Sequence, residues 1–176
     1  MTSLRPHYDL LPAGARFSGF MWPFAETWSQ VAQAFLPGSR QAGTQQARAL
    51  MSKLLLCGLV VGLASAASSA AVLGLAPQLF TRDASVIATV RSLTPLVTGC
   101  IGTVGVMCSM EGSLLATRRF RFLSAFYTAN AVALVLAFKS VEFLGLGLRA
   151  AWSCMLVFSI VRVGAFGMAL KRERPG

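Results

Sequence analysis

Uncharged apolar stretches alternate with short basic segments along most of this chain. Residues 54–81, 92–110 and 122–138 each contain no charged side chain. A helix needs about 20 apolar residues to cross the hydrocarbon core of a bilayer, and these stretches approach or exceed that length. The pattern therefore predicts an all-α protein, a polytopic membrane helix bundle.

The positions of the apolar stretches predict about five transmembrane helices within residues 20–170. The predicted helices cover residues 20–36, 44–75, 84–110, 120–138 and 146–170. Residues 1–19 are expected to form an irregular N-terminal segment, and residues 171–176 to form a basic tail.

Proline and capping residues mark some of the predicted boundaries. Pro37 and Gly38 are expected to end the first helix. Asp83 or Ser85 has the side chain needed to cap the third helix. Pro95 lies inside that third helix, where the missing N–H group is expected to produce a kink.

Small residues recur at every fourth position of the second predicted helix. This small-residue ladder consists of Gly58, Gly62, Ala66, Ala70 and Gly74. In lipid, such a pattern lets two helix backbones approach closely. The ladder therefore predicts helix–helix packing.

The composition supports the membrane interpretation and excludes several classes of protein. Of the 176 residues, 55% are hydrophobic and 12% are charged, about half the charge of an ordinary soluble domain. A secreted disulfide scaffold, a disordered chain and most soluble enzymes are therefore excluded. The four cysteines lie in apolar segments and the chain has one histidine, so we expect no metal site. The sequence shows no nucleophile–base pair and no phosphate loop, so we expect no cofactor and no enzymatic activity.

The net charge of +10 carries topological information. On one side of a five-helix zigzag lie nine basic residues: Arg40, Arg48, Lys53, Arg118, Arg119, Arg121, Lys171, Arg172 and Arg174. On the other side lie five: Arg16, Arg82, Arg91, Lys139 and Arg149. The positive-inside rule then places the C-terminus on the cytoplasmic side and the N-terminus on the far side. The predicted partner is the lipid bilayer, with no nucleic acid.

Several short motifs occur in order along the chain. Residues 29–37 read Ser-Gln-Val-Ala-Gln-Ala-Phe-Leu-Pro, residues 80–83 read Phe-Thr-Arg-Asp, and residues 111–116 read Glu-Gly-Ser-Leu-Leu-Ala. Together with Pro95, Trp152 and Arg162, they resemble the eighth to twelfth helices of the multidrug and toxic compound extrusion (MATE) family, particularly its plant and algal plastid-like branch. The resemblance implies a part of the second six-helix bundle of a twelve-helix transporter.

The resemblance also implies a function. MATE transporters are secondary antiporters that move organic ions, xenobiotics or metabolites in exchange for H⁺ or Na⁺. It implies an integral membrane location, in the chloroplast envelope if the source is photosynthetic and otherwise in the plasma or vacuolar membrane. Five helices are only part of a twelve-helix transporter, so this chain alone is not expected to transport. The alternative is a non-transporting structural or regulatory membrane fragment that associates with full-length partners through the small-residue ladder.

Glu111 is the first candidate for coupling to an ion or a proton. An ionisable residue in an apolar span is costly to bury, so such a residue usually faces a cavity or a partner. By the resemblance, Glu111 lies near an acidic residue associated with cation or proton coupling. The alternative is an interfacial carboxylate that pairs with Arg118 or Arg119.

Four further polar residues are candidates for the transport site. Glu26, Gln30 and Gln33 recur at i, i+4 and i+7, which places them on one helical stripe. That stripe would line a central cleft, with Glu26 as a second coupling residue and the two amides binding substrate, or it would be ordinary polar surface. Arg162 would pair with Glu111 or attract an organic anion in the cleft, or would extend its guanidinium to the membrane interface.

Overall fold

The computed structural model describes residues 26–41, 43–79 and 81–171, and every regular element within them is helical. The elements are α3 (Thr44–Leu75), the 3₁₀ turn η1 (Pro77–Leu79), α4 (Ala84–Ala116), α5 (Phe120–Phe143) and α6 (Gly147–Lys171). A further helix over residues 26–41 precedes α3. The predicted all-α class is therefore confirmed. The predictions for residues 1–25 and 172–176 lie outside the described residues.

Within the described part of the chain, α3 to α6 are the four helices that are long and apolar enough to cross a membrane. Large apolar side chains on these helices are exposed; Leu63 is 59% exposed, Leu136 is 63% and Val157 is 57%. Such surfaces are stable in contact with hydrocarbon and not with water. The chain is accordingly an integral membrane protein. The more polar helix over residues 26–41 is not among the four.

Three helices extend beyond their predicted ends. The helix over residues 26–41 passes through Pro37 and Gly38, α4 continues to Ala116, and α5 continues to Phe143. Pro37 is exposed, so solvent can satisfy the carbonyl group that lacks its N–H partner. The prediction for α4 stopped before Glu111, but the segment that follows contains no proline, and its one glycine packs against Ser29.

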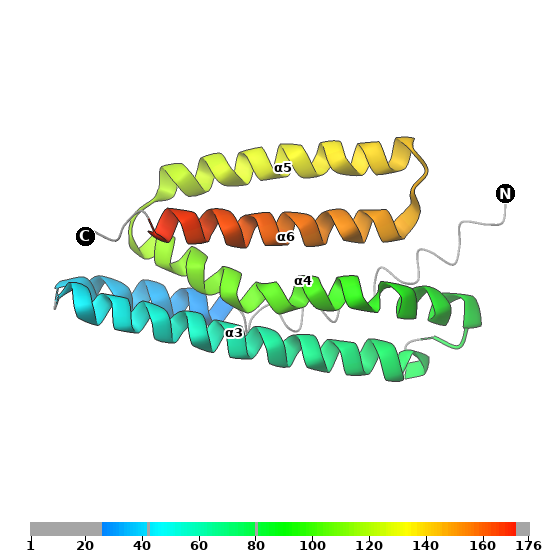
Figure 1. Cartoon of the computed structure of the whole chain (residues 1–176), viewed down its shortest axis with the longest axis horizontal. Helices are drawn as coiled ribbons and strands as arrows, with labels where there is room; N and C mark the ends of the chain where they lie inside the picture. The colour runs from blue at the N-terminus through cyan, green and yellow to red at the C-terminus, as the bar shows by residue number, and fades with distance from the viewer. Residues whose placement is uncertain (1–25, 42, 80, 172–176) are drawn as a thin grey trace.

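The helices lie side by side in the order α5, α6, α4, α3 (Figure 1). Consecutive helices run in opposite directions, and the helix over residues 26–41 lies alongside α3 and α4 (Figure 1). A Cβ atom at Gly112 of α4 would come within 2.6 Å of the Ser29 Cα atom, so the two backbones are in direct contact there. One end of the bundle therefore collects the turn before α3, the α4–α5 turn and the end of α6 (Figure 1).

The small-residue ladder forms the contact between α3 and α4. A Cβ atom at Gly105 of α4 would overlap the carbonyl oxygen of Gly58, and one at Gly62 would overlap the carbonyl oxygen of Gly102. The Ser109 hydroxyl bridges the same contact by donating a hydrogen bond of 3.2 Å to the Leu54 carbonyl. Because α4 covers the ladder, these glycines are not a free surface through which a separate protein could associate.

The α4–α5 turn closes with a left-handed residue that is not glycine. Arg118 has φ 57°. Its N–H donates to the Leu115 carbonyl, and the Arg119 N–H donates to the Leu114 carbonyl, at 2.9 and 3.1 Å. This Schellman pattern satisfies the last carbonyl groups of α4. The same pattern ends α5 at Gly145, where the glycine carries no penalty for φ 61°.

Asp83 caps the N-terminus of α4, and it was one of the two residues predicted for this role. Its Oδ1 atom accepts hydrogen bonds from the Ser85 N–H at 2.8 Å and from the Ser85 hydroxyl at 2.7 Å. These bonds favour the ionised carboxylate, so the hydroxyl and N–H of Ser85 hold the pKa of Asp83 below its usual value of 3.8. Pro95 lies inside α4, and the helix is continuous across it.

We expect the Asp83 cap to weaken in acid. Because the pKa is lowered by folding, the stabilisation is complete above the unfolded value and is lost as the pH falls below about 4 through the folded value. Hydrogen exchange at the Ser85 amide measures this loss as reduced protection. Asp83→Asn should keep the cap and remove its dependence on pH, whereas Asp83→Ala should reduce protection at every pH. A pH profile shared by the wild type and Asp83→Asn would contradict the expectation.

Candidate functional site

Two of the predicted site residues, Glu111 and Arg162, lie where α4, α5 and α6 meet. The apolar core at this position is centred on Phe166 of α6, which is fully buried. Its ring centroid lies 5.3 Å from that of Phe126 and 6.3 Å from that of Tyr127, both on α5. The polar groups described next are held against this aromatic cluster.

Arg162 of α6 extends its guanidinium into the bundle and not toward the membrane interface. One of its terminal nitrogens contacts the Met107 sulfur of α4 at 3.1 Å. The Cζ atom lies 4.7 Å from the centroid of the Tyr127 ring, within range of a cation–π interaction. The Nε atom is buried and has no hydrogen-bond partner within the described residues. Arg162 is thus a charge held by rings and a thioether, and is incompletely hydrogen-bonded.

Glu111 lies on the same side of α4 as Met107, one helical turn further along, and is partly buried. The Tyr127 hydroxyl interacts with both the Glu111 carboxyl group and the Arg162 guanidinium. No direct ion pair joins Glu111 to Arg162 among the described residues. The structure therefore brings together two of the predicted residues through a third, Tyr127, which sequence analysis did not identify.

Tyr127 could have been found from its position. The chain has two tyrosines, and this one lies in an uncharged apolar span. A hydroxyl in such a span needs a polar partner, which is the argument already applied to Glu111 and Arg162. The hydroxyl of Tyr127 within an apolar span was therefore the signal.

Glu26 approaches this group from the helix over residues 26–41. Both Glu26 and Glu111 lie near enough to the Cys108 sulfur to act on it electrostatically. Glu26 is exposed at the surface of the chain. The two coupling candidates thus both lie near Cys108.

Gln30 and Gln33 are not part of the group around Arg162. Their helix buries the neighbouring stripe, formed by Ser29, Ala32 and Leu36, and leaves both glutamines exposed. Gln33 donates a hydrogen bond of 3.2 Å from Nε2 to the Ser29 hydroxyl. The glutamine stripe is therefore a polar outer face.

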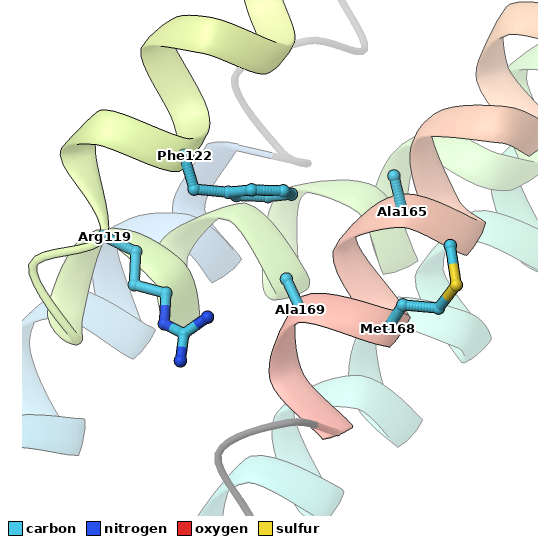
Figure 2. Close-up of a pocket in the computed structure, with 5 residues that line it drawn as sticks. All are labelled: Arg119, Phe122, Ala165, Met168 and Ala169. Carbon is cyan, nitrogen blue, oxygen red and sulfur yellow. The ribbon is translucent and has the colours of Figure 1, made fainter.

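A depression in the described surface lies elsewhere. It is an open hollow of about 160 Å³ between the start of α5 and the end of α6, lined by Arg119, Phe122, Ala165, Met168 and Ala169 (Figure 2). None of the predicted site residues lines it. In the part of the chain that the structure describes, no three His, Cys, Asp or Glu residues are grouped to hold a metal ion.

The chemistry available to the group is a change of charge at a helix interface. Protonation of Glu111 would remove a negative charge near the Arg162 guanidinium, and Tyr127 lies near enough to both residues to respond to it. In a site of low polarity, unscreened charges interact far more strongly than in water. Binding or release of one proton or cation would therefore change how α4, α5 and α6 attract one another.

Comparison with curated proteins gives one informative relative. The chain is 29% identical, over 152 residues, to Protein DETOXIFICATION 47, chloroplastic, of Arabidopsis thaliana. It resembles a DETOXIFICATION protein. The similarity covers 85% of this chain but 27% of the relative, so the chain spans about a quarter of that protein's length.

The DETOXIFICATION relative confirms the resemblance to the MATE family that the motifs predicted. No family model matches the chain. No solved structure matches it either.

Proposed function

We propose that this chain forms part of the second helix bundle of a MATE-type secondary antiporter. The transporter would move organic ions, xenobiotics or metabolites across a membrane in exchange for H⁺ or Na⁺. One observation carries the proposal: a carboxyl group, a phenol and a guanidinium meet across α4, α5 and α6, inside a membrane-length bundle whose sequence is similar to a DETOXIFICATION protein.

In this mechanism, Glu111 is the coupling residue and Arg162 and Tyr127 position it. Proton or cation binding at Glu111 alters the attraction between α4 and its neighbours, and this biases the bundle between two orientations. Glu26 also lies near Cys108, the residue that follows Met107 on α4. The exposed amides of Gln30 and Gln33 then offer hydrogen bonds to substrate or to the opposite bundle.

The relative's name supports a location in a chloroplast membrane. The basic end of the bundle, where the α4–α5 turn and the end of α6 lie, would face the compartment favoured by the positive-inside rule. In a cell without plastids, the plasma or vacuolar membrane is the corresponding location.

Flux measurements test the proposal. The whole protein encoded by the transcript that contains this chain is reconstituted in vesicles. Uptake of a fluorescent organic cation is then measured with a pH gradient, with a Na⁺ gradient, or with neither. We expect one gradient to accelerate uptake and the matching ionophore to abolish the acceleration. If carbonate extraction shows insertion but neither gradient accelerates uptake, the antiporter proposal fails and the non-transporting alternative is favoured.

A further inference from the structure

The turn between α5 and α6 is built from apolar residues that are exposed. Residues 143–148 read Phe-Leu-Gly-Leu-Gly-Leu. Phe143 is 90% exposed and Leu146 is 56% exposed, and Leu144 and Leu148 are exposed as well. A connection between helices is ordinarily polar because it faces water. An environment that is at least partly apolar therefore suits this turn.

The backbone of the turn is hydrogen-bonded to the end of α5. The N–H groups of residues 144–146 donate to carbonyl groups in the last turn of that helix, over 2.9 to 3.2 Å. Gly145 and Gly147 have φ of 61° and 76°, which lets the chain reverse direction tightly. Because these N–H groups have partners, contact with lipid does not leave them unsatisfied.

Contacts between α4 and α6 fix the level of this turn in the bundle. A Cβ atom at Gly99 would contact the Leu156 side chain, and the Arg162 guanidinium contacts the Met107 sulfur, so the paired residue numbers differ by 57 and 55. The two helices therefore run parallel, and α6 begins level with a point about seven residues inside α4, which is about 10 Å from the start of α4. The start of α4 accordingly extends beyond the α5–α6 turn (Figure 1).

The charged residues of α5 mark the edges of the hydrocarbon core. The uncharged run of residues 122–138 lies between Arg121 and Lys139, which are about 27 Å apart along the helix, close to the roughly 30 Å of the core. Phe143 lies four residues beyond Lys139, or about 6 Å. The headgroup layer adds about 5–8 Å on each side of the core. The turn thus lies at the depth of the headgroups, and the start of α4 reaches the water beyond.

We propose that the α5–α6 turn is an interfacial anchor, held in the headgroup layer with its apolar side chains against the upper part of the acyl chains. The occupant is lipid because the turn continues the exposed apolar surface of α5 and α6, which includes Leu136 and Val157. The ion pair of 3.0 Å between Lys139 and Glu142 places both charges in this layer as a neutral pair. The anchor fixes the depth of the α5–α6 pair in the bilayer. The proposal rests on the membrane-length helices and not on transport.

Spin-label accessibility tests the proposal. The whole protein encoded by the transcript that contains this chain is reconstituted in phosphatidylcholine vesicles, with a nitroxide attached through an encoded azidophenylalanine at position 146, so that the native cysteines stay unlabelled. Collisions with O₂, which concentrates in hydrocarbon, are compared with collisions with a water-soluble nickel chelate. The same label at Leu136 is the lipid reference, and at Ala84 it is the water reference. We expect the ratio of O₂ to nickel collisions at position 146 to lie between the references, at least about threefold above the Ala84 value.

Polar variants test whether the apolar side chains hold the turn in place. Phe143→Ser/Leu148→Ser should lower the ratio at position 146 to the Ala84 value and leave the Leu136 value unchanged, which shows that the helices still insert. Leu75→Ser/Leu79→Ser is the matched control, since it removes two exposed leucines near the α3–α4 connection, and it should not alter position 146. A ratio equal to that at Ala84 in the unsubstituted turn, or no change in Phe143→Ser/Leu148→Ser, would overturn the proposal. Few collisions with either reagent would also overturn it, because a protein segment would then cover the turn.

Discussion

Gly105→Ala is expected to destabilise the bundle more than any other glycine-to-alanine substitution in α3 or α4. The added Cβ atom would overlap the Gly58 carbonyl oxygen and would lie 3.0 Å from the Gly62 backbone nitrogen. Both neighbours are backbone atoms, so no side chain can rotate away and the helices must separate. We expect a loss of about 3 kcal/mol in the free energy of unfolding, at the upper end of overpacking costs.

Two glycines supply matched controls for Gly105→Ala. A Cβ atom at Gly102 would meet the Ala66 side chain at 3.4 Å, an ordinary contact, and one at Gly164 of α6 would have nothing within 4 Å. Gly164→Ala should be neutral or stabilising by up to about 1 kcal/mol, because alanine has the higher helix propensity. Unfolding in mixed micelles should rank the three variants as Gly164→Ala, Gly102→Ala, Gly105→Ala, from most to least stable. Equal stabilities would contradict the close α3–α4 contact.

Glu111→Gln is expected to abolish gradient-driven transport while leaving membrane insertion intact. Glutamine keeps the size and hydrogen-bonding capacity of the side chain but cannot bind a proton or present a charge to Arg162. We expect uptake to fall at least about tenfold, to the level of vesicles with a collapsed gradient, as for loss of a group that binds the driving ion. Any remaining uptake should no longer depend on pH.

Glu142→Gln is the control for Glu111→Gln. Glu142 ends its helix in an exposed ion pair with Lys139, so the same chemical change there should leave uptake unaltered. Tyr127→Phe adds a second measure, because it keeps the ring beneath Arg162 and removes only the hydroxyl. It should shift the pH profile of uptake without abolishing it. Unchanged gradient-driven uptake in Glu111→Gln would reject the coupling role, even if the protein transports.

Much of the helical structure could be predicted because it depends on local sequence. A helix satisfies its backbone groups internally, and in lipid this requirement is absolute, so an uncharged apolar run specifies a spanning helix with little tertiary information. Asp83 was recognisable as a cap because a cap acts within its own turn. The ends of helices were harder. The end of α4 was placed before Glu111 and the end of the first helix at Pro37, but both residues lie inside the folded helices.

The candidate site depended on distances between helices. Nothing in the sequence pairs Arg162 with Tyr127, which are 35 residues apart, or turns its guanidinium inward toward Met107. The glutamine stripe was recognised as one face, but which face of the helix is buried follows from its contact with Gly112.

The sequence alone determined that this is a helical membrane protein whose motifs resemble those of MATE transporters. The apolar stretches, whose backbone must be helical in lipid, and the small-residue ladder are both visible in the local sequence. Only the tertiary structure decided which ladder residues meet, that Tyr127 stands between Glu111 and Arg162, and how far α4 extends beyond the α5–α6 turn. Those features arise where helices that are distant in the chain pack together. The sequence of one helix does not specify which face of another helix it will contact.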